Sequence, residues 1–345
     1  MSCINLLDLS QNQLEEFIKQ LQQPSFRAKQ ISKWLYSGVV DFEEMTNLPA
    51  SLREQLSKQA ITGLLKIQDC RISEIDETRK YVFELCDGNI IESVLMKYKY
   101  GYSVCVSSQV GCKMGCSFCA STGAGFSRNL TAGEIIGQIL TINRDANVKI
   151  GNIVIMGIGE PLDNYDNIIN FLKKAQSPEG LGISYRRIAL STCGLVPGIL
   201  KLNKEDLPIT LSISLHSPFD EERSEMMPVN RTYSIDKLLE ACNIYTSGTN
   251  RRITFEYAMI SGVNDTLRHA TELAKLIEGM LCHVNLIPIN KVVGNNYKRS
   301  SKEQVENFSL VLNKSGIEVT VRRELGRDIN AACGQLRRSI TNSIE

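Results

Sequence analysis

The sequence predicts an α/β protein: a full or partial (β/α) barrel preceded by a helical accessory domain and a β-hairpin extension. From about residue 102 onward, short β-rich runs alternate with amphipathic segments, a pattern typical of βαβ units that share a parallel sheet. Before that point, apolar residues recur first with a helical period and then with a period of two. Periodicity alone does not separate a full or partial barrel from an open doubly wound sheet, but the number of repeats favours the barrel.

Residues 1–62 are expected to form the helical accessory domain. Apolar side chains recur there at the spacing that one face of an amphipathic helix requires, and Pro49 precedes the third such segment. The residues that mark the three helices are Leu14, Phe17, Ile18 and Leu21, then Ile31, Trp34 and Leu35, and finally Leu52 and Leu56.

Residues 63–101 are expected to form the β-hairpin extension. Tyr81, Phe83 and Leu85 alternate with polar residues, and a second apolar run follows at 90–96. Asp87-Gly88 lies between the two runs and is a turn signal of the kind that joins antiparallel strands.

Residues 102–345 are expected to form the barrel. The β-rich runs lie at 104–106, 153–156, 188–190, 209–215, 253–260, 284–287 and 317–321. The amphipathic segments between them lie at 134–142, 168–175, 235–244, 267–277 and 305–312. Thr131 and Glu134 form a capping box for the first of these helices.

Composition excludes several classes of protein. A hydrophobic fraction of 43% in 345 residues supplies a sizeable core, which excludes global disorder. The 39 Lys and Arg residues against 38 Asp and Glu leave a net charge of +1, so a polyanionic partner must be held by local basic patches. No apolar run is long enough to span a membrane, and the N-terminus does not resemble a signal peptide, so we expect a cytoplasmic protein.

Three of the 11 cysteines crowd into one glycine-containing loop. Cys112, Cys116 and Cys119 follow the first predicted barrel strand, and thiolates at this spacing can converge on one metal centre. Zinc sites usually add a second cysteine pair or histidines, and none lie nearby. A [4Fe–4S] cluster normally takes four thiolates. Three local ligands therefore favour a cluster with one iron open to a non-protein ligand over three unligated thiols.

The spacing Cys-x3-Cys-x-Phe-Cys resembles the signature of the radical S-adenosylmethionine (SAM) superfamily. The resemblance implies a partial barrel of the radical SAM type, with SAM chelated at the open iron and cleaved reductively to a 5′-deoxyadenosyl radical. Further motifs extend over nearly the whole chain and match one family in order. They lie at 26–30, 41–48, 105–112, 156–164, 190–194, 212–217, 285–290 and 328–336.

That family is the dual-specificity RNA adenine-C2 methyltransferases. The resemblance implies methylation of one adenosine in the peptidyl-transferase loop of 23S rRNA and of the adenosine 3′ to the anticodon in tRNA, with two SAM molecules per turnover. It also implies an electron donor such as flavodoxin and a monomeric enzyme. The chain departs from the family pattern at Lys291 and Asn330, where proline and aspartate are usual.

The resemblance assigns roles to individual residues. Cys333 would carry the methyl group as S-methylcysteine, Cys105 would release the RNA adduct through a transient disulfide with Cys333, and Glu92 would accept the C2 proton. Cys105 could instead be the base. The residues implied in SAM binding are Gly159, Glu160, Ser191, Ser214, Leu215, His216 and Asn290. Candidate RNA contacts are Arg27, Lys29 and Lys33, then Lys97, Tyr98, Lys99 and Tyr100, and finally Arg322, Arg323 and Arg327.

Two other functions are compatible with parts of the pattern. The sister family that methylates adenine C8 and confers antibiotic resistance shares the cluster and both extra cysteines, but it tends to have alanine where this chain has Pro161. An iron–sulfur electron carrier or redox sensor would need neither the SAM-binding residues nor Cys333. The sequence therefore favours the C2 methyltransferase.

Overall fold

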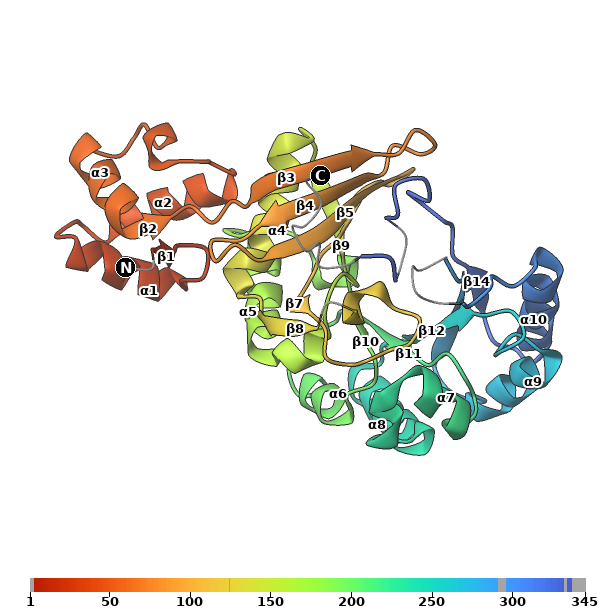
Figure 1. Ribbon diagram of the computed structural model, residues 1–345. Helices are drawn as coiled ribbons and strands as arrows, with labels where there is room; N and C mark the ends of the chain where they lie inside the picture. Colours follow the sequence, from red (N-terminus) through yellow and green to blue (C-terminus); the bar gives the residue numbers. More distant parts are fainter. Residues whose placement is uncertain (1–2, 124, 291–295, 332–333, 337–345) are drawn as a thin grey trace.

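A curved ten-stranded sheet organises the fold (Figure 1). The computed structural model describes residues 3–123, 125–290, 296–331 and 334–336. The sheet order is β14-β13-β12-β11-β10-β9-β6-β5-β4-β3. Its parallel strands are β6 (Gly101–Cys105), β9 (Ile150–Ile155), β10 (Ile188–Thr192), β11 (Thr210–Ser214), β12 (Ile253–Met259), β13 (Cys282–Pro288) and β14 (Val319–Val321).

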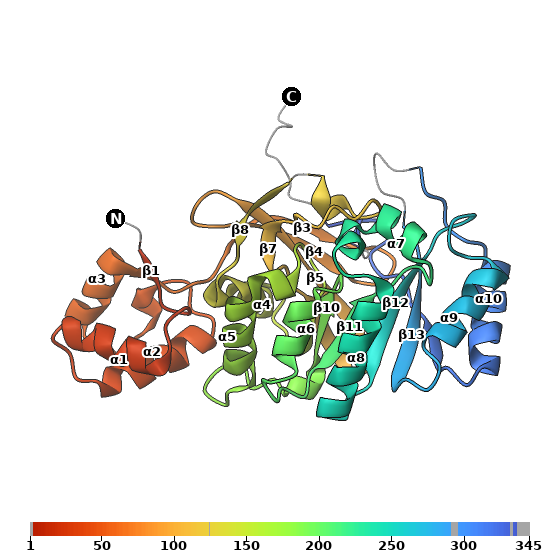
Figure 2. The ribbon, with the colours of Figure 1, turned by 90° about the horizontal axis from the view of Figure 1, so that it is seen from below.

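The sheet does not close, because β14 and β3 are its two ends in the described chain. Helices cover its convex face, as Figures 1 and 2 show, and leave the concave face toward the interior. This arrangement confirms the predicted partial barrel. The outer helices are α4 (Ala132–Asp145), α5 (Tyr165–Gln176), α6 (Val196–Leu202), α7 (Asp220–Met226), α8 (Ile235–Thr249), α9 (Leu267–Leu276) and α10 (Lys302–Lys314).

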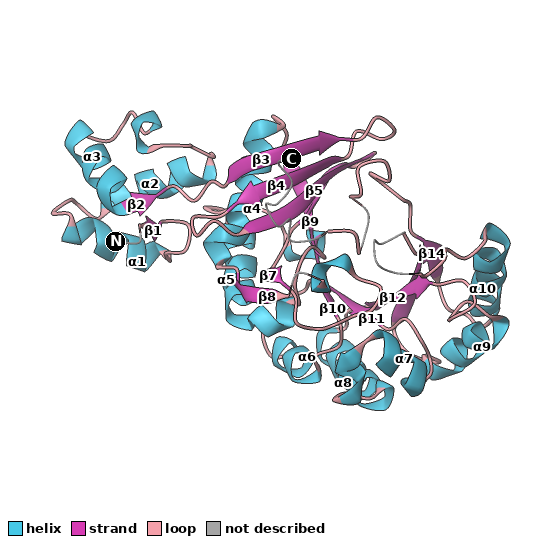
Figure 3. Cartoon of the chain, viewed as in Figure 1, coloured by secondary structure: helices cyan, strands magenta, loops and turns pink. Residues whose placement is uncertain are grey.

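The predicted hairpin corresponds to β4 (Arg79–Glu84) and β5 (Ile90–Tyr98), which pair antiparallel (Figure 3). A further antiparallel strand, β3 (Lys66–Ile72), pairs with β4 on the outer side. On the inner side β5 pairs antiparallel with β6, so the extension continues the barrel sheet. Val94 of β5 lies opposite Cys105 at the carboxyl end of β6, which brings the early residues of β5 to the end of the sheet where parallel strands place functional groups.

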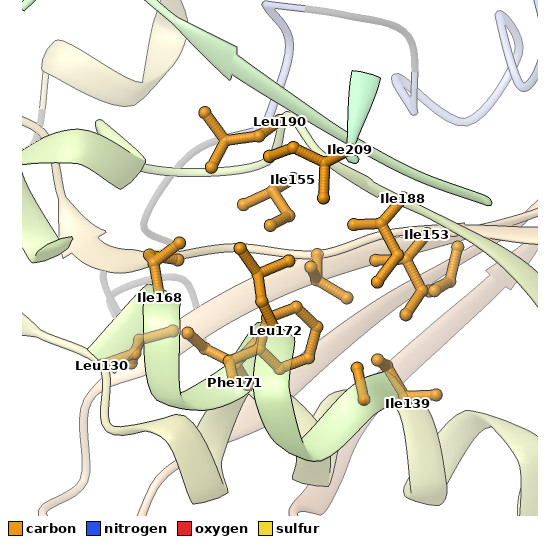
Figure 4. Packing of buried hydrophobic residues seen from close by; sticks show 14 of the residues in the cluster. Leu130, Ile139, Ile153, Ile155, Ile168, Phe171, Leu172, Ile188, Leu190 and Ile209 are labelled. Atoms are coloured by element: carbon orange, nitrogen blue, oxygen red, sulfur yellow. The ribbon is translucent and has the colours of Figure 1, made fainter. Parts of the chain in front are cut away.

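In the core, the apolar face of a helix packs against the apolar face of a strand (Figure 4). Ile153 and Ile155 of β9 point to one face because successive strand side chains alternate. On α5, Ile168, Phe171 and Leu172 share one stripe and pack against that face. All five are buried, and each contributes about 1.5–3 kcal/mol relative to an exposed side chain.

The N-terminal residues form a separate helical layer at one end of the molecule. It contains the three predicted helices, α1 (Gln11–Gln20), α2 (Phe26–Tyr36) and α3 (Ala50–Gln59). The short strands β1 (Ile4–Asn5) and β2 (Ala60–Ile61) pair parallel and bring the two ends of this layer together. Ser10 caps α1 through a capping box with Gln13.

Polar contacts fix this layer against α4 and α5. The Asp8 carboxylate accepts a hydrogen bond from the backbone N–H of Gly133, in the first turn of α4, at 2.6 Å. The ammonium of Lys174 on α5 donates to the carbonyls of Leu7 and Leu9 at 2.8 and 2.5 Å. Arg144 donates to the Gly38 carbonyl at 2.8 Å. Two helices of the barrel therefore hold the segment that precedes α1 and the turn that follows α2.

Short elements complete the described chain, in which no helix is long and apolar enough to cross a membrane. They are the antiparallel pair β7 (Gln109–Gly111) and β8 (Phe126–Asn129), and the 3-10 turns η1 (Phe42–Glu44), η2 (Ala120–Thr122), η3 (Pro161–Asn164), η4 (Tyr185–Arg187) and η5 (Pro228–Arg231).

Candidate active site

Two adjoining pockets lie inside the barrel, and several residues line both of them, including Cys119, Gly157 and Gly334. We call the first the cysteine pocket; the expected site residues that line it are Cys112, Cys116, Cys119, Gly159, Glu160, Ser191, Ser214, His216 and Asn290. We call the second the C-terminal pocket; it is lined by Val94, Met96, Tyr98, Cys105, Arg322, Arg323, Leu325, Ala331 and Gly334, among others.

The expected SAM-binding residues converge because they follow the carboxyl ends of neighbouring parallel strands. Glu160 follows β9, Ser191 lies in β10, Ser214 ends β11 and Asn290 follows β13. Parallel strands bring these ends to one edge of a sheet. Leu215 differs: its side chain is fully buried and does not line the pocket, and its N–H donates to the carbonyl of Glu256.

Glu160 is a buried carboxylate held by backbone donors. The N–H groups of Cys193 and Leu162 donate to it at 2.8 and 3.0 Å. Burial raises the pKa of Glu160, and these hydrogen bonds offset part of that rise. Its own N–H donates to the Gln109 side chain at 2.8 Å. The carboxylate is therefore already oriented to accept a hydrogen bond from a ligand ammonium group.

Gly159 makes this turn possible. Its φ of +108° lies in a region that L-residues rarely adopt, and a Cβ there would lie 2.5 Å from Cβ of Gln109. The backbone at Gly159 can therefore pass close to Gln109, which in turn holds Glu160.

The three cysteines occupy the loop between β7 and η2. Cys116 is buried, and Cys112 and Cys119 are partly buried. Burial raises the pKa of Cys112 to about 11 and also raises that of Cys116, and the neighbouring thiols raise both further. Thiols that disfavour one another's ionisation fit a cationic metal centre, which stabilises thiolates. In the described ranges no three Cys, His, Asp or Glu side chains already stand in a metal-binding arrangement.

His216 is a buried, neutral histidine at the end of β11. Its Nδ1 accepts a hydrogen bond from the N–H of Ala258 at 3.0 Å, and burial lowers its pKa to about 3. Its φ is +61°, a strained value for a side chain of this size. The ring meets Phe118 of the cysteine loop edge-on, with centroids 4.7 Å apart. His216 therefore links β12 to the loop that carries the cysteines.

Cys105 and the residues that flank Cys333 share the C-terminal pocket. Cys333 itself lies outside the described residues, while Ala331 and Gly334 line the pocket together with Cys105. The carbonyl of Gly334 accepts a hydrogen bond from the N–H of Ala120, just after Cys119, at 2.8 Å. The C-terminal segment is thus held directly to the cysteine loop.

Glu92 lies on β5, two residues before Val94, and is 2% exposed. Its carboxylate forms a 3.0 Å ion pair with Lys80 of β4, whose side chain is also buried. Glu92 is not among the residues that line either pocket. Its assignment as proton acceptor therefore stays a prediction.

Two buried charged residues of the site were not anticipated from the sequence. Arg223 of α7 is fully buried, and its guanidinium donates to the carbonyls of Cys193, Ser214 and Leu215 at 2.9–3.0 Å. Glu256 of β12 lines the cysteine pocket, 3.8 Å from the Arg322 guanidinium. Arg223 lies in a run of acidic residues, which suggests an exposed helix. Glu256 lies in a mostly apolar strand. Neither pattern indicates a buried charge in a functional site.

Comparison with known proteins decides the family. Residues 4–62 match the model of the ribosomal RNA large subunit methyltransferase N-terminal domain, and residues 106–274 match the radical SAM superfamily. A "Probable dual-specificity RNA methyltransferase RlmN" of Clostridium tetani is 52% identical over 97% of this chain and 96% of its own length. The chain belongs to the RlmN family. A relative with the same description from Clostridium beijerinckii is 52% identical over 99% of this chain and 97% of its own.

The fold of this chain is also seen in a crystal structure of a radical SAM methyltransferase from Sphaerobacter thermophilus. It is 44% identical, covers 96% of this chain and 99% of its own, and superposes with a TM-score of 0.94. The resemblance inferred from the cysteine loop and the later motifs is therefore confirmed. Membership of the radical SAM superfamily implies an iron–sulfur cluster and SAM.

Proposed function

We propose that this RlmN-family chain methylates C2 of one adenosine in the peptidyl-transferase loop of 23S rRNA and of the adenosine 3′ to the anticodon in tRNA. The observation that carries the proposal is the shared wall of the two pockets. The cysteine pocket holds the expected cluster and SAM residues, and the C-terminal pocket holds Cys105 beside the neighbours of Cys333. Methyl-group supply and methyl-group transfer can therefore take place side by side.

The residues of the cysteine pocket suit the implied cofactors. The thiolates of Cys112, Cys116 and Cys119 would hold a [4Fe–4S] cluster with one open iron, and the Glu160 carboxylate would accept the ammonium group of SAM. The other SAM contacts would come from Gly159, Ser191, Ser214, His216 and Asn290, which line this pocket. Leu215, whose side chain is buried away from the pocket, would act by holding Ser214 and His216 in place. When bound, the cluster and SAM supply a methyl group and a 5′-deoxyadenosyl radical.

Cys333 would carry the methyl carbon. C2 of adenine is an electron-poor aromatic carbon, so it does not attack the SAM methyl group as a nucleophile. A carbon radical generated on S-methylated Cys333 can add to C2 instead. The adduct would then lose the C2 proton to the base and one electron to the oxidised cluster. The Cys105 thiolate then attacks Sγ of Cys333 and forms a Cys105–Cys333 disulfide. The bond from that sulfur to the transferred carbon breaks, and its electron pair stays on the carbon, which takes up a proton and becomes the methyl group. A thiol reductant resets the pair.

Contacts to RNA would come from the N-terminal helices and from the region around the C-terminal pocket. Tyr98 lines that pocket, and its ring stacks on Tyr100 with centroids 5.0 Å apart and an interplanar angle of 6°. Tyr100 is 70% exposed, and Arg323 is exposed at the same pocket. Aromatic faces and cations are suited to unstacked bases and phosphates. We place the enzyme in the cytoplasm as a monomer that takes electrons from a donor such as flavodoxin.

The test is anaerobic reaction of the cluster-loaded protein with SAM, a reductant and either tRNA or 23S rRNA. Nucleosides from digested RNA are then identified by mass spectrometry. We expect 2-methyladenosine from both RNAs and an S-methyl group on the Cys333 peptide. Recovery of 8-methyladenosine would show that the chain has the activity of the sister family, which methylates adenine C8. An RNA without new methyl groups, with the cluster fully loaded, would contradict the proposal.

A further inference from the structure

The inner face of β4 and β5 carries a buried ion pair at an unusual place. Lys80 and Glu92 are 6% and 2% exposed, and their charged groups lie 3.0 Å apart. Removing two charges from water costs several kcal/mol per ion, so a buried pair adds little net stability and can be replaced by apolar residues at no loss. The pair therefore calls for an explanation other than stability.

The Lys80 ammonium has a second partner, which belongs to the C-terminal segment. It donates to the carbonyl of Asn330 at 3.3 Å. One cation thus touches both the carboxylate expected to accept the C2 proton and the chain three residues before Cys333.

The connection from β3 to β4 fixes the same segment at two more points. The carboxylate of Asp328 accepts hydrogen bonds from the Ser73 hydroxyl at 2.7 Å and the Glu74 N–H at 3.0 Å. The carboxylate of Asp76 accepts one from the N–H of Gly326 at 2.9 Å. The side chains of Asp76 and Asp328 are partly or fully exposed, whereas that of Lys80 is buried. Of these three anchors on the extension, Lys80 therefore contacts the residue that lies nearest to Cys333 along the chain.

We propose that Lys80 is a positioning residue for methyl transfer. It fixes the position of the Glu92 carboxylate relative to the segment that carries Cys333. The inference rests on the proposed function and deepens it. Proton removal requires the C2–H bond to point at the Glu92 oxygen at the moment when C2 is joined to the carbon carried by Cys333. A single ammonium bound to both elements fixes that relation, while the proton passes to Glu92 and the C–H electron pair stays in the ring.

The experiment compares full-length Lys80→Met, Lys80→Gln and Lys80→Arg proteins, loaded with cluster, with the wild type. Lys66→Met is the matched control, because Lys66 pairs with Glu84 at 2.7 Å on the same extension but its side chain is exposed. Three quantities are measured: S-methylation of Cys333 without RNA, kcat and KM for tRNA, and the isotope effect on product formation with C2-deuterated adenosine in the RNA.

We expect Lys80→Met to lower kcat by about 10- to 100-fold, part of the 10²–10⁴ that a positioned base contributes, with KM changed by less than about twofold. Methylation of Cys333 should stay within about threefold of the wild type, since that step needs no proton acceptor at C2. The deuterium isotope effect should rise above the wild-type value because proton removal becomes rate-limiting. Lys80→Arg should recover part of kcat, and Lys66→Met should match the wild type.

Two results would overturn the inference. The first is an unchanged kcat in both Lys80→Met and Lys80→Gln. The second is an equal loss of Cys333 methylation and RNA methylation with an unchanged isotope effect, which would show a purely structural role. If Lys80→Met does not load its cluster, Lys80→Gln, which keeps a hydrogen bond without the charge, decides between these results. A wild-type protein that produces no methylated RNA would refute the proposed function itself.

Discussion

Replacement of the buried Arg223 tests how the carboxyl ends of β10 and β11, which we call the rim of the barrel, are held together. Its guanidinium makes four hydrogen bonds, to the carbonyls of Cys193, Ser214 and Leu215 and to the side chain of Asn230 at 2.6 Å. Bonds to a charged group contribute about 1.5–3 kcal/mol each, so the gross contribution is about 6–12 kcal/mol. Burial lowers the pKa of Arg223, which shows that desolvation of the charge opposes part of this contribution.

For Arg223→Met we therefore expect the free energy of unfolding to fall by about 3–5 kcal/mol, well below the gross sum. Urea unfolding followed by far-ultraviolet circular dichroism is the appropriate assay. The single tryptophan, Trp34, lies in α2 and would report the N-terminal helices instead of the barrel. SAM affinity, measured by calorimetry on the cluster-loaded protein, should fall as well, because Ser214 lines the cysteine pocket.

The control is Arg231→Met, the same substitution at an exposed position, for which we expect a change within about 0.5 kcal/mol. The reasoning would be refuted if Arg223→Met unfolded within about 1 kcal/mol of the wild type. It would also be refuted if the variant lost stability but bound SAM with wild-type affinity, since the rim would then not depend on the guanidinium.

Three further outcomes are expected. Gly159→Ala should cost at least about 1–3 kcal/mol in urea unfolding and weaken SAM binding, because an alanine there is strained and meets Gln109; wild-type values for both would contradict the geometry. Because the pKa of His216 is about 3 in the folded protein and near 6.5 in the unfolded chain, only the unfolded chain gains the proton between these values. Unfolding free energy should fall with decreasing pH by up to about 1.4 kcal/mol per unit there, and a His216→Asn variant with an equally steep profile would exclude this origin. Cys105→Ala should accumulate a covalent protein–RNA adduct on denaturing gels, and efficient product release by this variant would remove Cys105 from that step.

Much of the fold could be predicted because its elements carry strong periodic signals. The stripe at Ile168, Phe171 and Leu172 and the apolar runs of the barrel strands each indicate a buried face. Strand β3 gave no such signal, since it is an edge strand with mostly polar, partly exposed residues. Helix α7 is only 7 residues long, and its acidic residues indicate an exposed helix, so the sequence does not predict that its one arginine is buried.

The site was predictable where chain topology brings residues together. Glu160, Ser191 and Ser214 belong to different strands, but a parallel sheet places the ends of all three strands at one edge. Lys80 and Asn330 are 250 residues apart, and no rule of periodicity connects them. Charged side chains are also expected in solvent, so burial of Lys80, Arg223 and Glu256 could be learned only from tertiary structure.

The contacts of Asp8 and Lys174 with the barrel bear on how a substrate would be chosen. They tie the N-terminal helices to α4 and α5, so the separation between these helices and the C-terminal pocket is set by the fold. An RNA that grips both places must present a flipped adenosine at that reach from its docking surface. The protein would then select RNAs by the distance between their docking surface and the flipped adenosine, in addition to any recognition of the base itself.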